Sequence, residues 1–111
     1  MLRALFLGFI KLHILHHAAS GPVYGLWLIE ELARHGYTLS PGTLYPTLHS
    51  MEEAGYLTSE RHVVGGRMRR YYTATAAGRA ALTEARDRVA ELAAEVLEEP
   101  PRQTRQGANL P

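Results

Sequence analysis

The chain of 111 residues contains no cysteine and no long apolar run. Without cysteine there is no disulfide framework, no thiolate nucleophile and no zinc or iron–sulfur site built on thiolates. No apolar stretch is flanked like a signal peptide or a membrane span, so we expect a cytoplasmic protein without a membrane partner. The sequence also lacks a nucleophile motif, a phosphate-binding loop and a paired-carboxylate site. We therefore predict that the protein is not an enzyme and requires no cofactor.

Charge is nearly balanced in sum but uneven along the chain. The formal net charge is +1, yet residues 61–70 hold four arginines and no acid. Residues 84–99, in contrast, hold six acids and two arginines. This segregation predicts a basic patch and an acidic helix, and the patch indicates a polyanionic partner only if its geometry is suitable.

Residues 40–54 are predicted to form a helix with one buried and one accessible face. Ser40 can cap the free N–H groups of the first turn, Pro41 fits that turn, and Gly55 ends the helix. Pro46 removes one backbone hydrogen bond, which predicts a kinked or late-starting first turn. The face opposite the small polar residues is apolar and carries Leu44, Leu48 and Met51. Taken alone, this stretch is equally well explained as an awkward helix start or as a recognition surface.

Two more helices are predicted before this one. Residues 2–19 carry two apolar stripes at helical spacing, so we expect one stripe to pack on the core and the other on a partner chain. Residues 23–35 follow a Ser-Gly-Pro turn, and Gly36 ends their helix. For this second helix the pattern predicts an inward face of Leu26, Ile29, Leu32 and Ala33 and an outward face of Glu30, Glu31 and Arg34.

A β-hairpin is predicted after the third helix. Residues 56–64 and 67–73 are extended segments separated by Gly65-Gly66, which is typical of a two-residue hairpin turn. The arginines of the basic patch fall on this element. We expect three of them to be displayed together on one projecting surface: Arg67, Arg69 and Arg70.

A long last helix is predicted to begin at Thr75, which caps it. Its apolar residues recur at alternating spacings of three and four, which is typical of a helix that pairs with a second copy of the chain. Folding back on the first helix of the same chain is the alternative. Pro100-Pro101 then ends the helix.

Three histidines lie near the end of the first helix: His13, His16 and His17. His13 and His17 are four residues apart, and two imidazoles one turn apart can reach a common divalent metal ion. Histidines in a last helical turn also favour the negative end of the helix dipole, and no carboxylate completes an H-E-x-x-H signature. A purely structural role is therefore the commoner explanation, and metal sensing is kept as an alternative.

The order of three helices, a hairpin and a further helix is that of a winged helix-turn-helix domain. We predict a mainly α fold with a small β-hairpin (α+β). In this geometry the third helix enters the DNA major groove and the hairpin wing follows the flanking phosphates. The predicted segments are a DNA-binding domain over residues 1–74, a dimerisation helix over residues 75–99 and a disordered tail over residues 100–111.

Motifs within this order resemble those of the PadR-like transcriptional regulators over about residues 12–82. They are SGPVYG (residues 20–25), LSPGTLYPTL (39–48), MEEAGYL (51–57), GGRMRRYY (65–72) and TAAGR (75–79). The chain is similar in particular to the short-tailed members, because a single long helix follows the wing. The resemblance implies a homodimer, joined by the first and last helices, that binds an inverted-repeat operator in double-stranded DNA and usually represses transcription.

The same resemblance implies roles for individual residues. At or near the DNA it places Ser40, Pro41, Gly42, Thr43, Tyr45, Pro46, His49, Gly65, Gly66, Arg67 and Arg69. At the dimer contact we expect Leu2, Leu5, Phe9, Leu82, Ala85, Val89, Leu92 and Val96. Two alternative functions are a metal-responsive regulator and a winged-helix module that binds protein through its acidic last helix. A small aromatic effector between the first and last helices of two chains is also left open.

Overall fold

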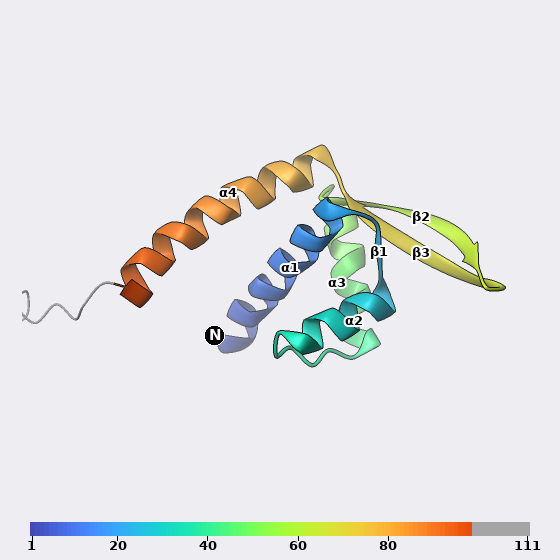
Figure 1. Cartoon of the computed structure of the whole chain (residues 1–111), viewed down its shortest axis with the longest axis horizontal. Coiled ribbons are helices and arrows are strands. Elements are labelled where there is room, and N and C mark those ends of the chain that lie inside the picture. The colour runs from blue at the N-terminus through green and yellow to red at the C-terminus, as the bar shows by residue number, and fades with distance from the viewer. Residues whose placement is uncertain (99–111) are drawn as a thin grey trace, which may run out of the picture.

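The computed structural model describes residues 1–98 (Figure 1). The predicted fold class, mainly α with a small hairpin, is confirmed. The elements are α1 (Leu2–Ser20), β1 (Val23–Tyr24), α2 (Gly25–Arg34), α3 (Pro41–Glu53), β2 (Leu57–Val64), β3 (Arg67–Ala74), α4 (Ala76–Ala93) and the π-helical turn η1 (Ala94–Glu98). The tail predicted for residues 100–111 lies outside the described residues. Within residues 1–98, no helix combines the length and the apolar character needed to cross a membrane.

The first three helices enclose one buried core, against which the sheet and the start of α4 pack. Its most enclosed side chains are aliphatic and come from all three helices: Ile14, Leu28, Leu32, Leu44 and Leu48. Burying one such side chain contributes about 1.5–3 kcal/mol. The core therefore fixes the orientation of α3 relative to α1 and α2.

The second helix begins later than predicted, because Val23 and Tyr24 form the short strand β1. Val23 lies opposite Tyr72 and Tyr24 opposite Tyr71 of β3, and the sheet order is β1–β3–β2. β-Branched and aromatic residues suit a strand, and the free edge of β3 offers them backbone partners. The sequence pattern of residues 23–35 contains no sign of this distant edge, so helix α2 starts only at Gly25.

The inward face of α2 also differs from the prediction. Leu28 and Leu32 are wholly buried, whereas Leu26 is 57% exposed. Glu31, predicted to face outward, is only 9% exposed. Two apolar stripes compete on this helix, and packing against α1 and α3 selects the one that contains Leu28. This choice carries Glu31 into the interior with it.

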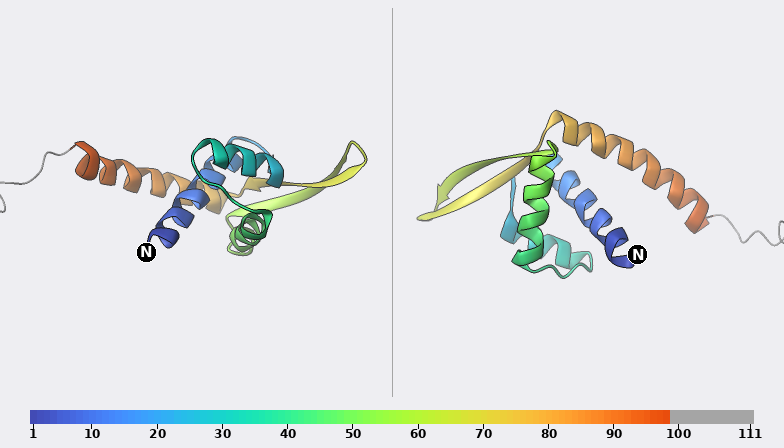
Figure 2. Two further views of the ribbon diagram at one scale, coloured as in Figure 1. Left: turned by 90° about the horizontal axis from the view of Figure 1, so that it is seen from below. Right: turned by 180° about the vertical axis from the view of Figure 1, so that it is seen from behind.

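The hairpin forms as predicted and projects away from the helices (Figure 2). β2 and β3 pair antiparallel, with Val64 opposite Arg67 across the turn. Gly65 and Gly66 have φ angles of 58° and 78°, which are left-handed values that glycine adopts without strain. The pair therefore closes the two-residue turn that the sequence predicts.

Helix α4 begins as predicted, since the side chain of Thr75 accepts a hydrogen bond of 3.0 Å from the Gly78 N–H group. The first part of the helix packs on α1, and Leu82 is buried in the core of its own chain. Arg86, one turn further on, still lies 3.5 Å from His16 of α1, and the last part of α4 then diverges from α1 (Figures 1 and 2). The first half of the helix thus folds back on α1, as the alternative predicted, and pairing of its second half with another copy of the chain stays a prediction.

We predict that Gly78→Ala destabilises the protein, because a methyl group there would overlap the carbonyl oxygen of Tyr56. Overpacking of this kind costs about 1–3 kcal/mol, and the melting temperature should fall by several degrees. Gly8→Ala is a matched control in α1, since a Cβ atom at Gly8 would meet nothing within 4 Å. Equal melting temperatures for both variants would contradict the prediction.

Candidate nucleic-acid interface

The amino-terminal turn of α3 is exposed and is capped by backbone rather than by a side chain. The carbonyl oxygen of Ser40 accepts hydrogen bonds of 3.0 Å from the N–H groups of Thr43 and Leu44. The predicted side-chain cap is not formed, because the Ser40 hydroxyl points to the Thr43 hydroxyl at 3.5 Å instead. The small residues Pro41 and Gly42 leave this helix end open to an approaching group.

Helix α3 passes through Pro46 without a break, so the predicted late start is not observed. The helix begins at Pro41 and continues to Glu53. Proline cannot donate to the carbonyl of Gly42, but Gly42 is exposed and water can take that place. At the next residue, the Thr47 hydroxyl donates a hydrogen bond of 2.8 Å to the carbonyl of Thr43.

The two faces of α3 divide as predicted. Leu44, Leu48 and Met51 are buried, while the outward face is exposed and consists mainly of small or polar residues: Pro41, Gly42, Tyr45, Pro46, His49 and Ser50. Thr43 is half-buried at the edge between the two faces. The His49 ring lies 3.7 Å from the carboxylate of Glu53, and both side chains remain in solvent.

Tyr45 links α3 to the start of α2. A Cβ atom at Gly25 would overlap the hydroxyl end of the Tyr45 ring, so the glycine lets the two helices approach at this point. Tyr45 nevertheless keeps 46% of its surface exposed. Contact with α2 therefore holds the Tyr45 ring in place, while the accessible part of the ring belongs to the outward face of α3.

The hairpin arginines do not lie on one surface, because neighbouring residues of a strand point to opposite faces. Arg67 and Arg69 share one face of β3. Arg70 is on the other, opposite Arg61 of β2. The expectation that Arg67, Arg69 and Arg70 are displayed together is therefore wrong.

Arg69 is largely occupied within the sheet. Its guanidinium lies over the ring of Tyr24, 4.0 Å from the ring centroid. Hydrogen bonding to Tyr71 and the nearby phenols hold the pKa of Arg69 above its ordinary value. Arg69 thus ties β1 to β3, whereas Arg67 beside the glycine turn is exposed.

Arg70 faces α3 and joins the wing to it. Its guanidinium donates to the Ser59 hydroxyl at 3.0 Å, and that hydroxyl donates to the Glu52 carboxylate at 2.8 Å. A hollow of about 530 Å³ lies here between α3 and β3, lined by Tyr45, His49, Glu52, Glu53, Arg70 and Tyr72. Arg70 and Tyr72 were missing from the predicted site. Counting alternate positions back from a buried Tyr72 could have placed Arg70 on this face.

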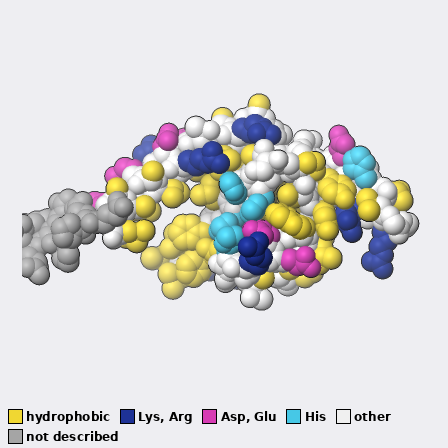
Figure 3. Space-filling model, viewed as in Figure 1, with side chains coloured by type: hydrophobic (Ala, Val, Ile, Leu, Met, Phe, Trp, Pro, Cys, Tyr) yellow, Lys and Arg dark blue, Asp and Glu magenta, His cyan; other side chains and the backbone are white. Residues whose placement is uncertain are grey.

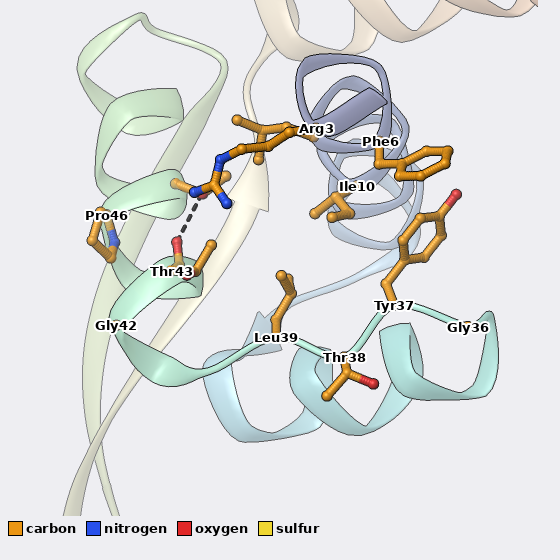
Figure 4. A pocket seen from close by; sticks show the side chains of 12 residues that line it. Arg3, Phe6, Ile10, Gly36, Tyr37, Thr38, Leu39, Gly42, Thr43 and Pro46 are labelled. Carbon is orange, nitrogen blue, oxygen red and sulfur yellow. Dashed lines mark hydrogen bonds between the residues drawn. The ribbon is translucent and has the colours of Figure 1, made fainter. Parts of the chain in front are cut away.

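A second hollow, of about 570 Å³, lies behind the amino-terminal turn of α3 (Figure 4). Phe6 and Ile10 of α1 form one wall, and Tyr37 to Leu39 of the connection between α2 and α3 form another. Its lining is mostly apolar, with Arg3 at the edge. Any group that filled it would touch Thr43 and Pro46 from behind the exposed face.

The histidines of α1 separate into two sets. His13 stacks on His35, the residue that follows α2, with ring centroids 4.8 Å apart, and the His17 ring lies 3.5 Å from Glu31 of α2. His16 is not part of the cluster of ligand atoms: its ring meets that of His17 edge-on, with centroids 5.0 Å apart, and lies 3.5 Å from Arg86 of α4. His13 and His17 therefore come together as expected, His16 does not join them, and His35 is the partner that the sequence did not reveal.

The arrangement of α1 to α3 with the projecting hairpin defines a winged helix-turn-helix protein. A family model described as "Transcriptional regulator PadR-like family" matches residues 14–84. The chain therefore belongs to the PadR-like family of transcriptional regulators, as the motifs predicted. This is a family of regulators and not of enzymes.

Individual relatives agree with this assignment. The chain is 65% identical over 88 residues to the "Transcriptional regulator Rv3488" of Mycobacterium tuberculosis, which covers 79% of this chain and 82% of the relative. A solved PadR family regulator from Eggerthella lenta has 32% identity and a TM-score of 0.74, covering 86% of this chain and 85% of its own. A PadR-like regulator from Bacillus cereus has 27% identity and a TM-score of 0.74, covering 80% and 88%.

We predict that Ser59 and Glu52 are energetically coupled, since one hydrogen bond joins the wing to α3 through them. In a double-mutant cycle of Ser59→Ala and Glu52→Ala, unfolding in urea should give a coupling energy of about 0.5–3 kcal/mol. The matched cycle uses Ser59→Ala and Glu53→Ala, because Glu53 is the exposed neighbour of Glu52. Additive effects in the first cycle would show that the link contributes nothing.

Proposed function

We propose that the protein binds double-stranded DNA as a homodimer and represses transcription from an inverted-repeat operator. The observation that carries this proposal is the exposed outward face of α3 beside a hollow whose other wall bears Arg70. A helix face made mainly of small or polar residues can enter the major groove closely, while the wing meets the neighbouring phosphates. Membership of a family of transcriptional regulators supports the same function.

Different residues then have different tasks on the DNA. Thr43 and His49 on α3 bond base edges, and Tyr45 contacts the sugar-phosphate backbone. On the wing, Arg61 and Arg67 are exposed and supply salt-dependent attraction to phosphates. Arg69 acts mainly by holding the sheet together, because its guanidinium is stacked on Tyr24.

A dimer is supported by the apolar side chains that one chain leaves uncovered. On α1 they are Leu2, Leu5, Phe6 and Phe9, on α4 Val89 and Leu92, and on η1 Val96, all between 37% and 63% exposed. Apolar side chains cluster visibly at the amino-terminal end of α1 (Figure 3). Burying such surface contributes about 25 cal/mol per Å². Because Leu82 is already buried in its own chain, the proposed contact starts beyond it, near Ala85.

We predict that arginine and threonine substitutions affect DNA binding in different ways. Arg61→Ala or Arg67→Ala should weaken binding to all sequences and reduce the salt slope by about one, whereas Thr43→Ala should relax preference at one base position by about 1–3 kcal/mol. The measurement is fluorescence anisotropy at several salt concentrations, with operator variants. Arg88→Ala, an exposed arginine of α4, is the control and should bind like the wild type.

If neither wing variant changed the affinity, the wing would have no part in the complex. If the wild type failed to bind any fragment of its own promoter region, DNA binding would be rejected in favour of the alternative function, a winged-helix module that binds protein through its acidic last helix.

We predict that Leu92→Glu dissociates the dimer, because it places a charge within the proposed contact on α4. Sedimentation velocity should show a monomer for this variant and a dimer for the wild type. Leu26→Glu is the control, since Leu26 is 57% exposed on α2, comparable to the 51% of Leu92. Loss of the dimer in both variants, or in neither, would contradict the proposed interface.

A further inference from the structure

Helices α1 and α2 each present two metal-binding side chains one turn apart, and the two pairs face each other. α1 contributes His13 and His17, and α2 contributes Glu31 with His35 directly after its end. One ligand nitrogen from each of the three histidines lies within 4.8 Å of the others. The Glu31 carboxylate is 3.0 Å from the His35 ring and 3.5 Å from that of His17.

We infer that His13, His17 and His35 form a binding site for a divalent transition-metal ion, with Glu31 as fourth ligand or as the partner that orients a histidine. Imidazole nitrogen with a carboxylate is a donor set that zinc and its neighbours prefer. Nitrogen ligands about 2.0–2.1 Å from a tetrahedral ion lie roughly 3.4 Å from one another. Side-chain rotations are therefore enough to close the observed cluster around an ion.

The charge state of the cluster suits a cation. Burial, together with the neighbouring histidines, lowers the pKa of His13 and of His17. Burial acts to raise the pKa of Glu31, but hydrogen bonds from His35 and Arg34 outweigh it and hold the carboxyl ionised. The Glu31 carboxylate thus lies beside the imidazoles, and its arginine partner within residues 1–98 is Arg34, which is itself mostly in solvent.

The position of the cluster relates it to regulation. Histidines gather on one face over α1 and α2 (Figure 3). α1 carries the proposed dimer surface, and α2 packs against α3 and receives Tyr45 at Gly25. An ion held by both helices would fix the orientation of α1, which carries the proposed dimer surface, relative to α3, the helix proposed to enter the major groove. This regulatory step rests on the proposed function, whereas the metal site itself does not.

Trp27 offers a direct test of where a metal binds. It is the one tryptophan of the chain, and its ring lies 5.2 Å from that of His17. Titrating metal-free, full-length protein with Co²⁺ should quench Trp27 emission and produce the visible absorption of a tetrahedral site, at one ion per chain. Zn²⁺ should then displace the Co²⁺, and isothermal titration calorimetry gives its affinity.

We predict that His13→Asn, His17→Asn and His35→Asn each weaken Zn²⁺ binding by at least about tenfold. His16→Asn is the matched control, because His16 is on the same helix but outside the cluster, and it should bind like the wild type. Thermal unfolding without metal confirms that each variant is folded. The inference is overturned if the wild type does not bind Zn²⁺ or Co²⁺, if His16→Asn weakens binding as much as His17→Asn, or if ions bind without changing Trp27 emission.

The regulatory step has its own measurement. Zn²⁺ should change the operator affinity of the wild type and leave that of His17→Asn unchanged. Equal operator affinity with and without Zn²⁺ would overturn regulation by metal while leaving the site intact. Because the metal titrations contain no DNA, failure of the site and failure of DNA binding are separate results.

Discussion

The complete burial of Leu44 and Leu48 is the constraint on which the proposed interface depends. Both side chains belong to the core that α1 and α2 also line, so α3 cannot turn about its axis without exposing them. Rotating the helix would cost the burial free energy of two leucines, about 3–6 kcal/mol. The outward face is thus determined by what the inward face buries. Gly25 adds a second fixed point, because it lets Tyr45 lean on α2.

At its base the wing is held by burial of Leu57, Tyr72 and Ala74 in the core, and further out it is joined to this helix by polar contacts. Arg70, Ser59 and Glu52 form a chain of hydrogen bonds across the space between β3 and α3. Such bonds contribute about 1 kcal/mol each, far less than the core does. The hairpin beyond them has no packing partner within residues 1–98 and is braced mainly by β1, through Arg69 stacked on Tyr24. This division leaves a firmly held α3 beside a hairpin with weaker attachments, which suits the proposed contact of the wing with phosphates.

Local signals in the sequence were enough for most elements. The cap at Thr75, the Gly65-Gly66 turn and the apolar period of α3 each involve residues close together in the chain, and each prediction is confirmed. Two of the failures required knowledge of distant partners. Strand β1 exists because the edge of β3 is available, and Glu31 is buried because α2 packs through Leu28. The two faces of the wing were predictable in principle, since strand alternation alone separates Arg69 from Arg70.

The sequence pattern revealed only the α1 half of the histidine cluster, namely His13 and His17. The two apolar stripes of α1 indicate a helix with the core on one side and a predicted partner on the other. His13 and His17 are half-buried on this helix. A pair at this spacing is an incomplete site by itself, because the completing ligands come from a different helix. Glu31 and His35 repeat the same one-turn spacing on α2, and only the packing of α2 through Leu28 turns that pair toward α1. The core that orients α3 therefore also brings the histidine cluster together through Leu28. An ion bound at this cluster would act on the packing that positions α3.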